Sequence, residues 1–308
     1  MGLDGKGRDG VAKNKCRNDV RLSVARLDSS EDATSTGTTG REKRGDRRIV
    51  FAAVLIGVLA LALLLVIILS PEITVNAKDF SYNEIPAQSN ASIRVTNVNG
   101  KISLSSGSQS SVSITGKVTA RGLGSAPEQV GLRESNTNGE ISLETVFPTV
   151  SSILQSQTYD VQITLSIPSS VRFALVQIVN SNGSVDVGVL NASSVHVETV
   201  NGGVSLNCGS CEKVVASTTN GPVSATFASF SAVGQYTMTS VNGNVVAIVP
   251  SNSGFNFDAA TTYGTVDVSR RLTLTSQGTN LNNHMSGIVN GGGPSLRLMT
   301  ENGQVSIS

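Results

Sequence analysis

Residues 194–227 read SVHVETVNGGVSLNCGSCEKVVASTTNGPVSATF, and this stretch contains the same pattern twice. Apolar residues alternate with polar ones, an Asn-Gly step follows, and the alternation resumes. The two Asn-Gly steps, at Asn201 and Asn220, lie 19 residues apart. Period-two alternation rich in β-branched residues is typical of strands, and Asn-Gly supplies the positive φ angles that a sharp corner requires. The stretch therefore predicts two similar β-units, each ending at a corner.

The same core phrase, Asn-Gly-x-Ile/Val-x-apolar, recurs along the chain, with Tyr replacing Asn in one copy. Four of the seven intervals between copies are 19 to 22 residues, and the other three (39, 44 and 39) are close to two such units. A period of about 20 residues is the mark of a stacked repeat architecture. The predicted corners are Asn99, Asn138, Asn182, Asn201, Asn220, Asn242, Tyr263 and Asn302.

Two all-β folds can use such corners. In a β-solenoid, units of about 20 residues stack on one another around a narrow apolar core. In an antiparallel β-meander or sandwich, each Asn-Gly is instead a two-residue hairpin turn. The near-constant period favours the solenoid, since a meander has no reason to hold one length. Stacked Asn or Ser/Thr side chains at equivalent corners are then expected to hydrogen-bond along the axis.

The N-terminal part contains an apolar segment, IVFAAVLIGVLALALLLVIIL (49–69), with 21 uncharged residues. As a helix it is long enough to cross a hydrocarbon core of roughly 30 Å. The basic run REKRGDRR (41–48) precedes it, and the next cation is Lys78, so the positive-inside rule places the N-terminus in the cytoplasm and residues 70–308 outside. The arginine pair in DRRIVF leaves a cleaved twin-arginine export signal as the alternative. In both cases the larger part is exported.

These features divide the chain into four segments. Residues 1–48 are rich in small polar and charged residues and are expected to be a disordered cytoplasmic tail. A single transmembrane helix (49–69), a linker (70–90) and an extracytoplasmic β-repeat domain (91–308) follow. The tail has 12 Lys/Arg against 8 Asp/Glu, and the part from Ser70 onward has 11 against 14. Neither part is basic enough to predict a nucleic-acid partner.

The three cysteines are expected in two compartments, and the three sequons all lie in the exported part. Cys16 lies in the tail, where a reduced thiol is expected, whereas Cys208 and Cys211 form an exported C-x-x-C that predicts a structural disulfide. A redox-active pair is the alternative, but the motif lacks the helix N-terminus that lowers a thiol pKa. Three sequons are candidates for glycosylation, and Asn182 is the least favourable of them because its Asn-Gly forms a tight corner. They are Asn90, Asn182 and Asn191.

Neither the histidines nor the aspartates predict a site. His196 lies beside Glu198 on the outward face, but a metal site needs three or four converging ligands. Asp186 and Asp267 occupy the same repeat position about four units apart, which is roughly 19 Å at the spacing of stacked strands. Glycosidases need their two carboxylates within about 9.5 Å.

The remaining enzymatic candidate is the pair Arg270 and Arg271, just beyond Asp267. Polysaccharide lyases on β-helices use Arg or Lys together with acidic residues that bind Ca²⁺, yet an acid next to two arginines is usually an ordinary surface. No Ser-His-Asp, P-loop or zinc spacing is present in the sequence. We therefore predict no catalytic residue, no cofactor, no metal site and no enzymatic activity.

Three features together resemble a known family: the strand that ends at Pro168, the apolar strand 173–179, and the recurrent Asn-Gly-x-Val-x-Val. Over about residues 90–308 the chain resembles the adhesin-like, toast-rack-like (LiaG-type) β-repeat family of envelope proteins. The resemblance implies a membrane-tethered β-solenoid at the cell surface. Its motifs specify fold rather than chemistry, and the family offers no established catalytic residues.

The expected function is a membrane-anchored, non-catalytic, adhesin-like interaction module at the cell membrane. Its expected partners are an envelope polymer, a surface protein or other copies of itself, because flat solenoid faces offer extended binding area. One alternative is an envelope-stress or signalling ectodomain that acts through the tail. Another is a carbohydrate-active β-helix enzyme.

Overall fold

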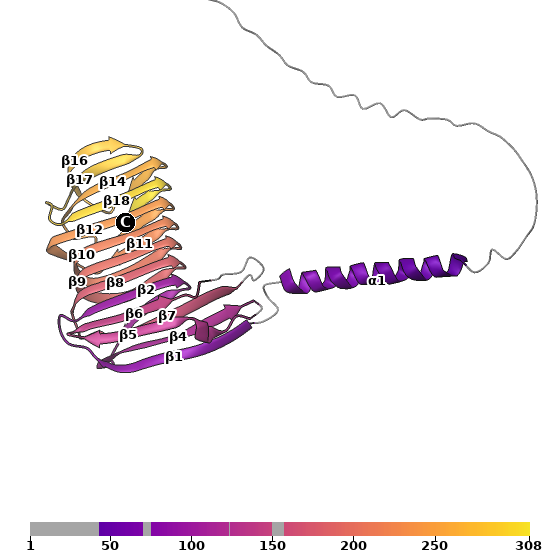
Figure 1. The fold of residues 1–308 in the computed structure, drawn as a ribbon. Coiled ribbons are helices and arrows are strands. Elements are labelled where there is room, and N and C mark those ends of the chain that lie inside the picture. Colours follow the sequence, from indigo (N-terminus) through magenta and orange to yellow (C-terminus); the bar gives the residue numbers. More distant parts are fainter. Residues whose placement is uncertain (1–42, 70–74, 123, 150–156) are drawn as a thin grey trace, which may run out of the picture. The chain divides into compact units, whose positions relative to one another are not determined.

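The computed structural model describes residues 43–69, 75–122, 124–149 and 157–308 (Figure 1). The chain divides into two compact units, Met1–Val58 and Leu59–Ser308, and the boundary between them falls within the helix α1. Most of the tail predicted to be disordered (1–48) lies outside the described residues.

Helix α1 spans Lys43–Leu69. It ends where the predicted apolar segment ends and begins before it, within the basic run 41–48. Its side chains are described over residues 51–66 and are exposed; Phe51, for example, is 75% exposed. Among the described residues, the structure holds no helix that is both long and apolar enough to cross a membrane.

The β-domain has two layers of strands that share β9 (Val185–Asn201) and β10 (Val204–Asn220). The first layer has the spatial order β5 (Gly131–Thr137), β6 (Glu140–Val146), β2 (Ser92–Asn99), β8 (Phe173–Asn182), β9, β10, β12 (Phe230–Asn242), β18 (Ser295–Asn302), β14 (Phe255–Tyr263), β17 (His284–Val289), β16 (Leu274–Leu281). The second layer has the spatial order β1 (Val75–Pro86), β4 (Ser111–Arg121), β7 (Thr158–Pro168), β3 (Ile102–Gly107), β9, β10, β11 (Val223–Phe227), β13 (Val245–Ile248), β19 (Val305–Ile307), β15 (Val266–Val268). A short 3-10 helix, η1 (Pro127–Gln129), lies between β4 and β5 in the chain.

The path of β9 shows how one unit is built. Its first part pairs with β3 in the second layer, its second part pairs with β8 in the first layer, and the chain bends between them near Asn191. The Asn201–Gly202 corner then returns the chain to the second layer, where β10 begins. All these pairings are parallel, so successive units stack (Figure 1). The all-β prediction is confirmed, and the units stack as the period of about 20 residues predicts.

The core lies between the two layers and follows the predicted alternation. Val185 and Val187 point inward from the second layer, and Val195 and Val197 point inward from the first; none is more than 2% exposed. Full burial of such a side chain contributes about 1.5–3 kcal/mol. One continuous hydrophobic cluster therefore runs through the stack.

The prediction that Asn138 is a solenoid corner is wrong. Asn138 and Gly139, at φ 54° and 79°, form the two-residue turn of an antiparallel hairpin between β5 and β6. Two consecutive positive φ angles match the primed turns that connect twisted antiparallel strands. The alternative use of Asn-Gly, as a hairpin turn, is thus found at this one of the eight predicted corners.

The linker predicted over residues 70–90 is also too long. Strand β1 pairs antiparallel with β4, from Val75 opposite Arg121 to Pro86 opposite Ser111. Phe80 and Tyr82 pack, partly buried, against the core. The polar residues between the apolar ones conceal this strand in the sequence.

The third departure concerns strand order near the C-terminal end of the stack. Strand β18 follows β14 in the chain but lies between β12 and β14 in the first layer, and β19 lies between β13 and β15 in the second. The intervening hairpin of β16 and β17 pairs antiparallel with β14 and covers that end of the first layer (Figure 1). The long interval between Tyr263 and Asn302 is therefore a capping hairpin followed by an inserted unit.

Candidate functional site

The corners of the stack carry a ladder of asparagine side chains. Each ladder asparagine except Asn99, which only accepts, donates from Nδ2 to Oδ1 of the asparagine on the neighbouring unit, over 2.7 to 2.9 Å. Because an amide has both a donor and an acceptor end, identical side chains can repeat this bond indefinitely. The asparagine ladder consists, in spatial order, of Asn99, Asn182, Asn201, Asn220, Asn242 and Asn302.

A second ladder lies inside the corners. Its side chains come two residues before each ladder asparagine and two residues before the corner residue Tyr263. There a hydroxyl or amide donates to a backbone carbonyl of the neighbouring unit; Thr218 Oγ1, for example, donates to Gly202 O over 2.8 Å. These side chains are buried, so the bond satisfies a carbonyl that water does not reach. The inner ladder consists of Asn97, Asn180, Thr199, Thr218, Ser240, Thr300 and Thr261.

Glycine is required at the corner because neighbouring backbones approach closely. At Gly183, where φ is +137°, an added Cβ would lie 2.2 Å from the carbonyl oxygen of Gly100. The side-chain-free corners let units stack at strand spacing along the whole edge. The corners are thus structural, and their hydrogen bonds hold neighbouring units of the stack in register.

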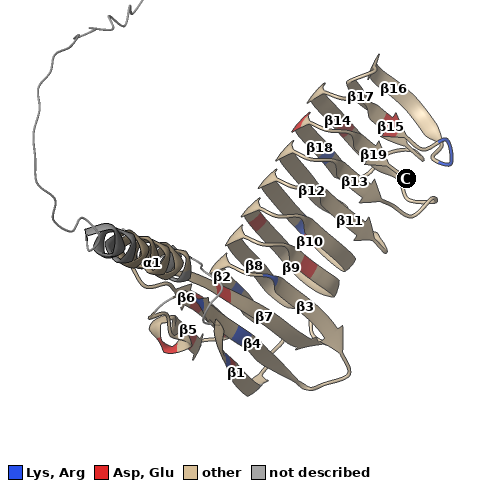
Figure 2. Cartoon of the chain, turned by 90° about the vertical axis from the view of Figure 1, so that its right-hand side faces the viewer, with Lys and Arg blue, Asp and Glu red and all other residues tan. Residues whose placement is uncertain are grey.

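The outer surfaces of the layers are mostly small and polar. On the second layer one outward row passes through eight strands in register, from β7 to β15. Charged residues are sparse over the stacked strands (Figure 2). This hydroxyl row consists of Thr164, Ser103, Asp186, Ser205, Ser224, Val246, Ser306 and Asp267.

The structure does not bring the acidic candidates together. Asp186 forms an ion pair with Lys101 (2.5 Å). Asp267 lies five strand steps from Asp186 along the hydroxyl row, one more than the sequence predicts, because β19 is inserted before β15. Five steps correspond to about 24 Å, which is too far for a carboxylate pair.

The other predicted candidates are also isolated. His196 Nε2 lies 3.5 Å from Glu198 Oε2 on the exposed face of β9. Arg270 and Arg271 are exposed in the turn after β15, and within the described ranges neither forms an ion pair with Asp267. In the same ranges no three His, Cys, Asp or Glu side chains are placed to hold a metal ion.

The first layer also carries a charged cluster that no sequence motif indicates. His284 Nε2 lies 2.8 Å from Asp258 Oδ1, and Arg297 Nε lies 3.8 Å from Asp258 Oδ2. The three residues come from β17, β14 and β18, so the cluster ties the capping hairpin to the stack. All three are partly exposed, and such surface pairs typically contribute only about 0–1 kcal/mol.

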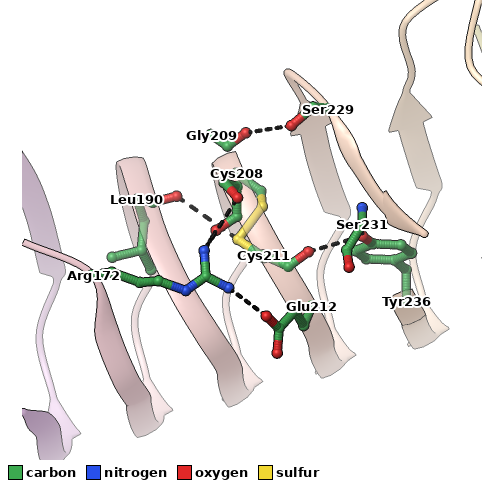
Figure 3. The surroundings of a disulfide bond; sticks show 10 residues. Arg172, Leu190, Cys208, Gly209, Cys211, Glu212, Ser229, Ser231 and Tyr236 are labelled. Carbon is green, nitrogen blue, oxygen red and sulfur yellow. Dashed lines mark hydrogen bonds and ion pairs between the residues drawn. A yellow bond between two sulfur atoms is a disulfide. The ribbon is translucent and has the colours of Figure 1, made fainter. Parts of the chain in front are cut away.

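Cys208 and Cys211 are joined by a disulfide at the bend of β10, where the chain passes from the second layer to the first (Figure 3). Both are buried. Arg172 contacts the outer side of this bend, donating to Ser210 Oγ (3.2 Å) and to Glu212 Oε1 (2.8 Å). The cross-link and the guanidinium together fix a bend that the other units make without them.

Tyr236 fastens the next unit to this bend. Its hydroxyl donates to Cys211 O and accepts from Ser231 N, both over 2.9 Å (Figure 3). Burial raises the pKa of Tyr236 above its ordinary value of 10.0, the hydrogen bond from Ser231 lowers it, and the Glu212 charge raises it. The phenol is therefore a neutral structural group.

The three candidate glycosylation residues lie in different surroundings. Asn90 is exposed in a turn at φ 66°, and Asn191 is half-buried at the bend of β9. Asn182 belongs to the asparagine ladder and uses its Nδ2 to bond Asn99. A glycan on Asn182 would therefore break a ladder bond.

A shallow hollow of about 600 Å³ lies at the C-terminal end of the second layer. Its polar side chains are amides, hydroxyls and one carboxylate, and Tyr263, 70% exposed, precedes it by two residues. In the described part of the β-domain Tyr263 is the most exposed aromatic side chain. The end hollow is lined by Thr265, Val266, Asp267, Asn282, Gln304, Val305 and Ser306.

Comparison with solved structures finds distant matches, each with a TM-score below 0.5. The chain is similar to a putative cell adhesion protein from Clostridium sporogenes ATCC 15579 (13% identity, TM-score 0.46), covering 75% of this chain and 98% of that one. It is similar to a putative adhesin from Bacteroides fragilis NCTC 9343 (11%, TM-score 0.29; 77% and 97%). It is also similar to a putative lipid binding protein from Parabacteroides distasonis ATCC 8503 (9%, TM-score 0.29; 76% and 97%).

No curated protein sequence matches the chain. The family assignment rests on a match that covers the β-domain as a whole, including β1. The chain belongs to the Toastrack DUF4097 family, which it matches over residues 72–308.

Proposed function

We propose that the protein is a membrane-anchored, non-catalytic interaction module that binds a hydroxyl-rich envelope polymer outside the cell. The observation that carries the proposal is the hydroxyl row together with the end hollow. Small polar groups repeat along the row at strand spacing, which suits an extended polymer better than a small substrate. Binding on such a surface is summed over many weak contacts rather than concentrated in a deep pocket.

The end hollow provides the most specific contacts in this proposal. Asp267, Asn282 and Gln304 offer acceptors and donors that suit sugar hydroxyls. Tyr263, two residues before Thr265 in the chain, offers an exposed ring on which the apolar face of a sugar can pack. We therefore infer that a glycan chain lies along the hydroxyl row and is held at its end by Tyr263.

Anchoring by residues 49–69 is part of the same proposal. The apolar side chains of α1 that the structure describes are exposed, and such a surface is unfavourable in water. The basic run before it supports a cytoplasmic N-terminus. The disulfide supports an oxidising location for the β-domain.

Two experiments test these claims separately. Carbonate extraction of cell membranes, followed by protease treatment of intact cells, checks the anchor. Recovery of the full chain in the carbonate-soluble fraction would rule out membrane spanning. For binding, the full-length protein in detergent is sedimented with purified cell-wall polysaccharide, comparing wild type with Tyr263→Ala and Gln304→Ala.

We expect both substitutions to weaken binding by about tenfold or more, the effect of removing roughly 1.4 kcal/mol. Thr239→Ala, on the outer face of the first layer, is the matched control and is expected to bind like wild type. Equal binding by all four proteins would refute the end hollow and Tyr263 as part of the binding surface. Loss of binding in the Thr239 variant alone would move the site to the first layer.

A further inference from the structure

An Asn-Gly step is chemically reactive when it is free to move. The backbone nitrogen of Gly attacks the Cγ of the Asn side chain, the nitrogen loses its proton, and ammonia leaves as a cyclic succinimide forms. Water then opens the ring to give Asp or iso-Asp. The reaction requires a free Gly N–H and an Asn amide that can rotate toward it.

Most Asn-Gly steps in this chain meet neither requirement. In the asparagine ladder the amide is bonded to a neighbouring side chain, and the Gly nitrogen is bonded as well; Gly202 N, for example, donates to Asn220 O over 2.9 Å. The same arrangement holds at the other ladder corners. The glycines whose backbone nitrogen donates a hydrogen bond in this way are Gly100, Gly183, Gly202, Gly221, Gly243 and Gly303.

Asn290–Gly291 lies outside the ladder and is held in another way. Asn290 adopts a positive φ of 48°, and its Nδ2 donates to Ser251 O and Ser253 O, each over 3.1 Å. The Gly291 nitrogen donates to Thr275 Oγ1 over 2.9 Å. A turn conformation alone therefore does not leave an Asn-Gly step free in this protein.

Asn138–Gly139 differs from the other seven. Asn138 is exposed at φ 54°, and in the described part of the chain its amide and the Gly139 nitrogen have no hydrogen-bond partner. Only the carbonyl of Gly139 is held, by Ser92 N over 2.8 Å. Strand β5, on one side of the turn, is an edge strand and mostly exposed, so local opening of the hairpin costs little.

We propose that Asn138 is a site of spontaneous deamidation, while the other Asn-Gly steps are protected by their hydrogen bonds. The product adds a negative charge at the hairpin tip, two residues from Glu140. Glu140 itself forms an ion pair with Arg94 (3.0 Å). The hairpin tip thus changes charge as the protein ages, without any enzyme.

The test is peptide mapping by mass spectrometry of the full-length protein, sampled during incubation at mildly alkaline pH. We expect deamidation at Asn138 to be at least about tenfold faster than at any other Asn-Gly step, because local opening of edges needs far less free energy than opening of a stacked core. Equal rates at Asn138 and Asn290 would overturn the proposal.

Two variants test the physical reason. Thr275→Val removes the acceptor of the Gly291 N–H while keeping the side-chain shape, and we expect it to increase deamidation at Asn290 several-fold without changing Asn138. Gly139→Ala keeps the turn exposed but crowds the attacking nitrogen, and we expect it to slow the reaction at Asn138. An unchanged Asn290 rate in the Thr275 variant would show that the hydrogen bond of the Gly291 N–H does not provide the protection.

Discussion

Asn302 donates a hydrogen bond from Nδ2 to Oδ1 of Asn242 over 2.9 Å, although 60 residues separate them in the chain. The bond places β18 directly beside β12 and continues the asparagine ladder across the inserted unit. On its other side Asn302 is aligned with Tyr263, which has no amide and therefore ends the ladder. The ladder thus has an interior, where each asparagine makes two bonds, and two ends.

The ladder's interior should be worth more to stability than its ends. Asn201→Ala removes two bonds, to Asn182 and from Asn220, whereas Asn302→Ala removes one. At about 0.5–1.5 kcal/mol for each exposed bond, we expect losses of about 2 and 1 kcal/mol respectively in the free energy of unfolding. Urea denaturation measures both. Equal losses would mean that the bonds do not act as a ladder.

The inner ladder can be tested without changing side-chain shape. Thr218→Val leaves the Gly202 carbonyl without its donor in a partly buried place, and we expect a loss of about 1–2 kcal/mol in the free energy of unfolding. Thr219→Val, at the adjacent exposed position, is the control and should change stability little. Similar losses in the two variants would argue against a role for the Thr218 hydroxyl.

The corner glycines should be much less tolerant than the hairpin glycine. Gly183→Ala combines a positive φ with a Cβ 2.2 Å from a backbone oxygen, so the neighbouring unit must move. Gly139→Ala has a positive φ of 79° but no atom within 4 Å of the new Cβ, so only the strain of about 1–2 kcal/mol remains. We expect the first variant to lose more than about 3 kcal/mol or to fail to fold, as measured by thermal unfolding. Equal tolerance would contradict the close approach of the corners.

Ionisation of Tyr236 should destabilise the fold at high pH. Burial raises its pKa in the folded state, so the folded protein keeps a proton that the unfolded chain loses above about pH 10. The stability contributed by the neutral phenol is fully present below that pH and is lost as pH rises through the folded pKa.

Tyr236→Phe provides the measurement. We expect it to be less stable than wild type by about 1–3 kcal/mol near neutral pH, because Ser231 N and Cys211 O lose their partner. Its free energy of unfolding should fall less steeply above about pH 10, although Tyr159, whose pKa burial also raises, retains part of the slope. Tyr263→Phe, at an exposed position, is the control. A wild-type slope in the Tyr236 variant would exclude this phenol as the cause.

The sequence predicts the repeating unit well because each unit is specified locally. Alternation sets which side chains enter the core, and Asn-Gly sets the corner. The sequence also distinguishes Asn138 from the true corners, by the residue type at the position four residues before the asparagine. That position is apolar and buried before the true corners, as at Val197 and Leu298, but it is Glu134 before Asn138. A unit that cannot bury this residue cannot stack.

The surface sites could not be predicted in the same way because they depend on the order of strands. The His284, Asp258 and Arg297 cluster combines a hairpin, a stacked strand and an inserted strand, and no local pattern states that these are neighbours. The end hollow likewise combines residues 265–267 with residues 304–306, which meet only because β19 pairs with β15. The repeat specifies the shape of one unit, while the insertion decides what gathers at the end.

The inserted strand also constrains how the chain can reach its native state. A chain that emerges from a ribosome or an export channel N-terminus first can stack β8 to β13 in the order in which they appear. It cannot then place residues 255–268 correctly, because their neighbour in the stack, residues 295–307, has not yet emerged. Until it does, β12 and β13 present open edges that could pair with the wrong strand or with another molecule. Folding of this end of the domain must therefore wait until residues 295–307 are available, and the edges of β12 and β13 stay exposed until then.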